Sequence, residues 1–155
     1  KAMTVMQSYL AQRAAQAAGA DDAILVDDEG HIFEGSTSNM LLVRGGGLVT
    51  PPAEGAILPG VLRGKLAELA ETHGIPFVEA LVRVPDLRPD DGMLLTSSVR
   101  GIVAVASVDG QALQADLPLF QQLLSLVEAA EAGSILAFRA ASSQRPADLQ
   151  STRGR

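Results

Sequence analysis

The sequence has 155 residues, and its 12 Lys and Arg against 18 Asp and Glu give a formal net charge of −6. It contains no cysteine, which excludes disulfides, thiol nucleophiles and cysteine-ligated metal centres. Two histidines, His31 and His73, are too few for a multi-histidine metal site, and we assign them no function. The acidic balance argues against nucleic-acid binding, and no apolar run approaches the roughly 20 residues of a membrane span.

The first 50 residues predict one helix followed by short strands. Residues 2–18 predict a helix that ends before Gly19, with one apolar face formed by Met6, Leu10, Ala14 and Ala17. Extended segments then follow, separated by turns rich in Asp and Gly: 23–26, 32–34, 39–44 and 48–50. We expect the first two of these segments to form a hairpin.

The remaining sequence predicts two further helices with strands between them. Apolar residues recur at helical spacing over 62–70, and His73-Gly74 marks the end of that helix. Residues 117–140 are typical of a helix interrupted at Gly133, and 141–155 of a flexible tail. Strands are predicted at 77–84, 93–95 and 102–108, with a polar loop over 85–91 and a hairpin turn at Asp109-Gly110. Strands and helices around one core predict an α/β or α+β domain.

The general nucleophile, metal-binding and phosphate-loop motifs are absent. Three short segments nevertheless differ from sequence that has only a structural role. A carboxylate precedes small polar residues in Glu34-Gly35-Ser36-Thr37-Ser38-Asn39. Leu58-Pro59-Gly60 precedes a helix whose first N–H groups suit an anion. Three hydroxyls adjoin in Thr96-Ser97-Ser98. Each feature alone is more often structural, so their joint order and spacing carries the argument.

In that order and spacing, the sequence resembles the carboxy-terminal domain of the fold-type IV pyridoxal-phosphate enzymes, the class IV aminotransferases. That family contains branched-chain aminotransferase, D-amino acid aminotransferase and aminodeoxychorismate lyase. The resemblance runs from residue 1 to about residue 113, and it includes Lys1, the segment 19–25, Thr50-Pro51-Pro52 and the segment 57–63. It implies a mixed sheet or pseudo-barrel flanked by helices, a cofactor-binding domain over 1–140, and pyridoxal 5'-phosphate as cofactor.

The resemblance implies roles for two charged residues. Lys1 matches the family lysine that bonds covalently to the cofactor aldehyde and later moves the proton on the α-carbon of the substrate, and both tasks need a primary amine. Glu34 matches the carboxylate that faces the pyridine nitrogen of the cofactor. A negative charge there keeps that nitrogen protonated, which makes the ring an electron sink.

Further residues match the positions that hold the cofactor phosphate and ring. Val61 and Leu62 correspond to residues whose backbone N–H groups bind the phosphate at a helix start. Ser98 corresponds to a hydroxyl that contacts the same phosphate, and Ser97 lies beside it. Leu58 corresponds to an apolar residue that packs against the ring.

Arg100 is a candidate for substrate binding. The stretch Val99-Arg100-Gly101 resembles a Leu-Arg-Gly stretch of many aminodeoxychorismate lyases, in which the arginine would grip a substrate carboxylate. An ion pair at the protein surface is the alternative for Arg100.

The sequence also departs from the family pattern. Thr4 stands where relatives often carry Asn, which affects the surroundings of Lys1, and Ala104 replaces a common Pro. The smaller amino-terminal domain of the family, with an arginine that grips the phosphate, is not in this sequence. Because the chain starts at Lys1 rather than Met, we expect it to be part of a longer protein, and we expect weak cofactor binding and little turnover from these residues alone.

Three functions remain open at this stage. The first is aminodeoxychorismate lyase, which releases pyruvate to leave 4-aminobenzoate and is favoured by Val99-Arg100-Gly101. The second is a transaminase for branched-chain or D-amino acids. The third is an inactive scaffold or dimerisation fragment. The resemblance also implies a homodimer, and the lack of a leader favours a cytoplasmic location.

Overall fold

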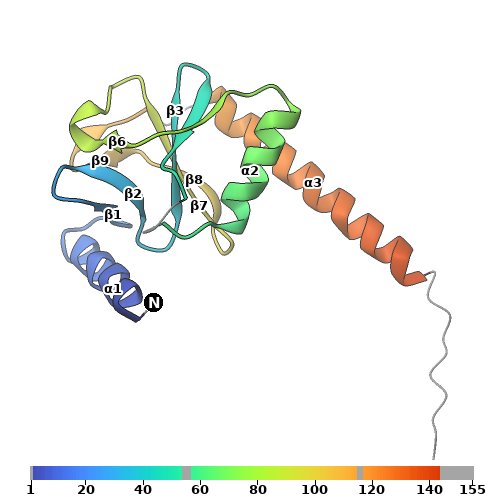
Figure 1. The fold of residues 1–155 in the computed structure, drawn as a ribbon, viewed down its shortest axis with the longest axis horizontal. Coiled ribbons are helices and arrows are strands. Elements are labelled where there is room, and N and C mark those ends of the chain that lie inside the picture. Colours follow the sequence, from blue (N-terminus) through green and yellow to red (C-terminus); the bar gives the residue numbers. More distant parts are fainter. Residues whose placement is uncertain (1, 54–56, 115–116, 144–155) are drawn as a thin grey trace, which may run out of the picture.

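The computed structural model describes residues 2–53, 57–114 and 117–143. A first helix, α1 (Ala2–Ala17), precedes the strands, a second, α2 (Val61–Thr72), lies among them in the sequence, and a third, α3 (Pro118–Ser143), follows them. Figure 1 shows α1 beside the first strand, β1 (Ile24–Val26), at one side of the sheet, α2 at the other, and α3 extending away from the body of the protein. The expectation of a mixed α+β domain is confirmed.

The described residues form one eight-stranded sheet and a separate hairpin. The sheet consists of β1 (Ile24–Val26), β2 (His31–Gly35), β3 (Asn39–Arg44), β4 (Gly47–Thr50), β5 (Phe77–Glu79), β6 (Val82–Arg83), β7 (Gly92–Ser97) and β8 (Gly101–Ala104). All paired strands are antiparallel except β4 and β5. The hairpin joins β9 (Ser107–Val108) to β10 (Gln111–Ala112) through the predicted turn, where Asp109 and Gly110 both have positive φ.

Strand β3 lies at the centre of the core. One of its edges pairs with β7 from Asn39 to Val43, while the other pairs with β2 near its start and with β4 near its end. Leu41 and Val43 face one apolar cluster that includes residues of α2 and α3, whereas Met40 and Leu42 face a second cluster. Because successive strand residues point to opposite faces, burial on both faces explains the uninterrupted apolar run 40–43.

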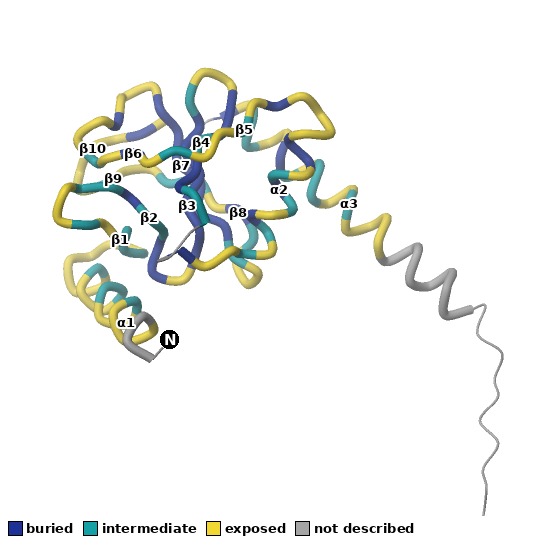
Figure 2. Tube along the Cα trace, in the orientation of Figure 1, coloured by how far each residue is buried: buried dark blue, intermediate teal, exposed yellow. Residues whose placement is uncertain are grey.

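The predicted apolar face of the first helix is exposed to solvent. Met6 and Leu10 are each 58% exposed, and Ala14 and Ala17 are exposed as well. The half-buried residues of α1 lie on another face, formed by Ser8, Ala11, Gln12 and Ala15. Figure 2 shows exposed and intermediate residues along the part of α1 whose burial is described, from residue 5 onwards. The helix prediction is therefore confirmed, but its small and polar residues are the ones that meet the domain.

Two predicted strands are divided in the structure. The segment 77–84 forms β5, which pairs with β4, and β6, which pairs with β2. The segment 102–108 is divided between β8 and β9. In both places the chain changes its pairing partner, and local sequence patterns carry no information on partners.

The last helix is longer and more continuous than expected. α3 passes through Gly133 without interruption, so the predicted break there is wrong. One glycine costs a helix only about 1 kcal/mol, which good helix formers on either side offset. The helix ends at Ser143, so residues 141–143 of the predicted tail are helical, and 144–155 lie outside the described residues. Among the described helices, none is long and apolar enough to cross a membrane.

Candidate active site

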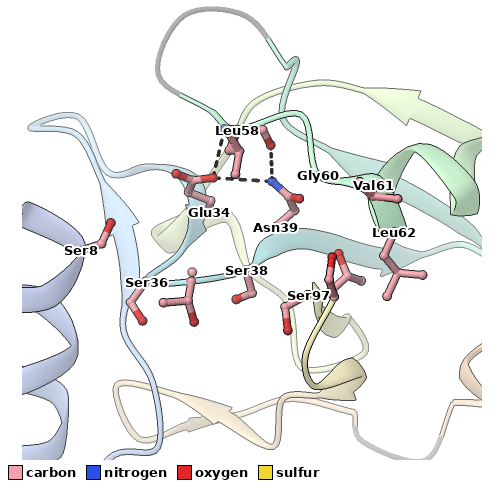
Figure 3. Close-up of a pocket in the computed structure, with 14 residues that line it drawn as sticks. Ser8, Glu34, Ser36, Ser38, Asn39, Leu58, Gly60, Val61, Leu62 and Ser97 are labelled. Carbon is pink, nitrogen blue, oxygen red and sulfur yellow. Dashed lines mark hydrogen bonds between the residues drawn. The ribbon is translucent and has the colours of Figure 1, made fainter. Parts of the chain in front are cut away.

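A pocket of about 340 Å³ lies where three segments of the chain meet. The end of β2 and the following turn form one wall, the segment leading into α2 forms another, and the end of β7 forms a third (Figure 3). Ser8 reaches the pocket from α1. The lining residues are Ser8, Glu34, Gly35, Ser36, Thr37, Ser38, Asn39, Leu58, Gly60, Val61, Leu62, Thr96, Ser97 and Ser98.

The Glu34 carboxylate is held in place from the opposite wall. The Leu58 N–H donates to Glu34 Oε2 at 3.3 Å. The Asn39 amide nitrogen donates to the Leu58 carbonyl at 2.7 Å and lies 3.5 Å from the same Glu34 oxygen (Figure 3). Burial raises the pKa of Glu34, against the opposing effect of the Leu58 N–H. A cationic or protonated group beside Glu34 in the pocket would lower this pKa again and so favour the ionised carboxylate.

The start of α2 offers backbone donors to the same pocket. The helix begins at Val61, and its N-cap, Gly60, makes no side-chain capping hydrogen bond. The first N–H groups of a helix have no partner within the helix, and they carry a partial positive charge. Val61 and Leu62 both line the pocket, so this end of the cavity suits an anion such as a phosphate.

Two buried hydroxyls at the pocket lack a hydrogen-bond partner. Ser38 is 8% exposed and Thr96 is 1% exposed, and neither side-chain oxygen is bonded to another group. Both residues line the cavity. Because an unpaired buried hydroxyl costs about 1–3 kcal/mol, these two groups point to a polar ligand that would pair with them.

The structure brings most of the candidate residues together. The pocket wall contains six of them: Glu34, Leu58, Val61, Leu62, Ser97 and Ser98. Lys1 lies outside the described residues. Arg100 does not line the pocket, and its guanidinium is paired with Asp22. Substrate binding by Arg100 therefore stays a prediction.

Sequence reasoning missed three residues of this region. It gave no role to Asn39, which connects Glu34 to Leu58, although Asn39 ends the motif that begins with Glu34. It also gave none to Thr96 or to Asp22, which holds Arg100. Each stands within a segment that carries the family resemblance, but only side-chain geometry separates bonded polar groups from unpaired ones.

Comparison with known proteins identifies the same segments. Residues 1–108 match the family model described as amino-transferase class IV. A candidate branched-chain-amino-acid aminotransferase of Methanocaldococcus jannaschii is 37% identical over 111 residues, which are 72% of this chain and 38% of that protein. D-alanine aminotransferase of Bacillus licheniformis is 31% identical over 76% of this chain and 41% of its own length.

Solved structures of similar proteins also include aminotransferases and a candidate lyase. A candidate 4-amino-4-deoxychorismate lyase of Legionella pneumophila superposes with a TM-score of 0.75 at 31% identity, over 81% of this chain and 47% of that chain. A hypothetical aminotransferase of Mycobacterium tuberculosis in its PLP-bound form gives 0.72 at 31% identity, over 81% and 44%.

This chain therefore spans less than half the length of each of these relatives. The match nevertheless includes every wall of the pocket: the turn after Glu34, the start of α2 and the end of β7 all lie within the segment that fits the family model. By this agreement of sequence, fold and pocket, the chain belongs to the class IV aminotransferase family.

Proposed function

We propose that this chain forms the pyridoxal-phosphate-binding part of an enzyme that acts on the amino group of an amino acid or a related amino-bearing acid. One observation carries the proposal. A single pocket combines the anchored Glu34 carboxylate with an uncapped helix start and two unpaired buried hydroxyls. The cofactor has a pyridine nitrogen at one end of its ring system and a phosphate at the other, so both ends find a complementary group.

Each residue of the pocket has a distinct task in this proposal. Glu34 would accept a hydrogen bond from the protonated pyridine nitrogen, whose charge offsets the burial of the carboxylate. The Val61 and Leu62 N–H groups and the Ser98 hydroxyl would hold the phosphate, and Ser97 lies beside them. Leu58, which is 67% exposed, would cover the ring with its side chain. When bound, the cofactor supplies an electron sink for bonds at the substrate α-carbon.

Lys1 completes the site in this proposal. Lys1 lies outside the described residues, and its support is the match of residues 1–108 to the family model. In this proposal Lys1 is the amine that bonds to the cofactor and later carries the proton of the α-carbon.

Reductive trapping tests the cofactor site directly. The chain is incubated with pyridoxal phosphate and reduced with borohydride, and the added mass is located by peptide fragmentation. The sequence contains two lysines, Lys1 and Lys65, so Lys65 serves as an internal control. We expect labelling of the Lys1 side chain, lost in Glu34→Ala and kept in Lys65→Ala. Equal labelling of both lysines, or none, would contradict the proposal and favour the inactive-scaffold alternative.

For the reaction, we favour 4-amino-4-deoxychorismate lyase. The stretch Val99-Arg100-Gly101 and the superposition on the Legionella candidate lyase support it. Transamination of branched-chain or D-amino acids is the second candidate, because relatives with those names match the chain. Pyruvate release from aminodeoxychorismate without an acceptor would establish the lyase, whereas turnover that depends on 2-oxoglutarate would establish the transaminase.

We also propose that the working protein is a homodimer. Four apolar side chains of α1 support this assembly, since Val5, Met6, Tyr9 and Leu10 are each more than half exposed. Light scattering on the eluted protein would show twice the chain mass. A single chain mass across micromolar concentrations would contradict the dimer.

A further inference from the structure

A buried carboxylate beside the pocket joins three segments that are distant in sequence. Asp22 lies in the loop between α1 and β1, and its side chain is 8% exposed. It bonds to Ser36, in the turn between β2 and β3, and to Arg100, in the turn between β7 and β8. Both turns belong to the wall of the pocket, the first through Ser36 and the second through Ser98.

Every oxygen of this carboxylate is occupied. The Ala23 N–H and the Ser36 hydroxyl donate to Oδ1 at 2.8 and 2.5 Å, and the Arg100 guanidinium donates to Oδ2. Burial raises the pKa of Asp22, but the hydrogen bonds from Ser36 and Arg100 outweigh it and lower the pKa below its ordinary value. Asp22 is therefore a carboxylate near neutral pH, with a charged partner.

The contacts of Asp22 and Arg100 also determine which neighbouring hydroxyls are bonded within the protein and which are left without a partner. The Ser36 hydroxyl is directed at Asp22, and the Ser97 hydroxyl accepts the Arg100 N–H at 3.0 Å within its own turn. By contrast, the Ser38 and Thr96 hydroxyls of the same two walls are unpaired. The serines bonded to this network thus hold the turns in shape, while Ser38 and Thr96 remain for a ligand.

We propose that Asp22 is a positioning residue of the pocket. Through its ion pair with Arg100, it fixes the turn between β2 and β3 relative to the turn between β7 and β8. In this proposal the task of Arg100 is to pair with Asp22. A binding site needs such a supporting layer to keep its donors in place. The effect on cofactor binding rests on the proposed function, whereas the ordering of the two turns does not.

The test combines hydrogen exchange with ligand titration. Asp22→Asn and Arg100→Met remove the ion pair from either side, and Arg100→Lys retains a charge. Asp86→Asn is the matched control, because Asp86 pairs with Arg83 on the exposed surface. Amide exchange is measured in 36–39 and 97–101 and compared with the central strand, 40–43. Affinity for pyridoxal phosphate is measured by absorbance, and affinity for inorganic phosphate by calorimetry.

We expect Asp22→Asn and Arg100→Met each to accelerate exchange in both turns about tenfold and to weaken pyridoxal-phosphate binding by a similar factor, with 40–43 unchanged. The double variant should be no worse than Asp22→Asn alone, because both changes break one interaction. Arg100→Lys should restore most of the affinity, and the Asp86→Asn control should match the wild type.

Three results would overturn the proposal. Unchanged exchange in both turns would show that the pair fixes neither of them. Additive effects in the double variant would show that Asp22 and Arg100 act separately. A loss of pyridoxal-phosphate affinity in Arg100→Met that Asp22→Asn does not share would show that Arg100 acts on the pocket without Asp22. If Asp22→Asn does not fold, Arg100→Met still tests the pair from its exposed side. If the wild type binds no pyridoxal phosphate, the proposed function fails, but the exchange data still decide on the pair.

Discussion

The amide oxygen of Asn39 occupies the position that a Cβ atom on Gly60 would need. The amide nitrogen of the same side chain donates to the Leu58 carbonyl at 2.7 Å and lies 3.5 Å from Glu34 Oε2. The residue before α2 must therefore lack a side chain if Asn39 is to connect the two walls of the pocket. A packing requirement at Gly60 is in this way linked to the placement of the Glu34 carboxylate.

Two glycines near the start of α2 give a matched pair of variants. In Gly60→Ala, the new methyl group displaces the Asn39 amide, and we expect a stability loss of about 1–3 kcal/mol. Pyridoxal-phosphate affinity should fall as well, since Glu34 loses its support. In Gly64→Ala, the added Cβ meets no atom within 4 Å, and the helix should gain about 0.5–1 kcal/mol. Urea unfolding and absorbance titration measure the two quantities. Wild-type affinity for pyridoxal phosphate in Gly60→Ala would show that Asn39 does not support the binding site.

Much of this fold is predictable because its signals are local. The apolar run of β3, the helical spacing of α2 and the Asp109-Gly110 turn each depend on neighbours in sequence. The division of 77–84 into β5 and β6 is different, because it follows from pairing with β4 and β2. Such long-range partners leave no periodic pattern in the segment itself.

The residues of the candidate site were likewise predictable from sequence only in part. Six of the candidate residues were recognised from motif order, and they line one pocket. Arg100 shows the limit of that reasoning, because its motif gave no sign of Asp22, which is 78 positions away in sequence. Thr96 was recognised as one of three adjacent hydroxyls, but its burial without a partner depends on the packing of β7 against β3.

Thr96 gives a second prediction, in which stability and binding change in opposite directions. Thr96→Val keeps the shape of the side chain and removes a buried, unpaired hydroxyl, so the ligand-free protein should gain about 1 kcal/mol. Pyridoxal-phosphate affinity should fall, because the ligand loses a partner. Thr50→Val is the control: Thr50 is also 1% exposed, but its hydroxyl donates to the Met40 carbonyl at 2.7 Å. That change should cost about 1–2 kcal/mol. Destabilisation by Thr96→Val would show that its hydroxyl already has a partner.

Glu34 gives a prediction on pH dependence. Burial raises its pKa in the folded protein above the ordinary value of 4.5. The folded state therefore binds the proton more tightly than the unfolded state, and Glu34 lowers stability as the pH rises through 4.5 and the folded pKa. Glu34→Gln removes this effect. Without ligand, the variant should become more stable relative to wild type between pH 4 and pH 7, yet bind pyridoxal phosphate less tightly. Urea midpoints across this range, with Glu29→Gln as an exposed control, provide the measurement. A difference that does not vary with pH would contradict the raised pKa.

The ion pair of Asp91 with Arg44 predicts a dependence of stability on pH that is opposite to that of Glu34. Asp91 is 1% exposed and accepts from Arg44 Nε at 2.7 Å, from Arg44 Nη2 at 2.6 Å and from the Arg88 N–H at 2.8 Å. Burial raises the pKa of Asp91, but the hydrogen bonds from Arg44 outweigh it and lower the pKa below 3.8. The pair therefore stabilises the fold above pH 3.8, and this contribution disappears as the pH falls through the folded pKa.

Asp91→Asn should accordingly cost about 3 kcal/mol at pH 7, since half-buried Arg44 loses the charge of its buried partner. The cost should shrink as the pH falls below 3.8 and the wild-type carboxylate takes up a proton. Asp86→Asn breaks the exposed pair with Arg83 and should cost less than about 1 kcal/mol. Urea unfolding of the three proteins at pH 7 and pH 2 makes the comparison. An equal loss from Asp91→Asn at both pH values would mean that the shape of the side chain, and not its charge, stabilises this part of the sheet.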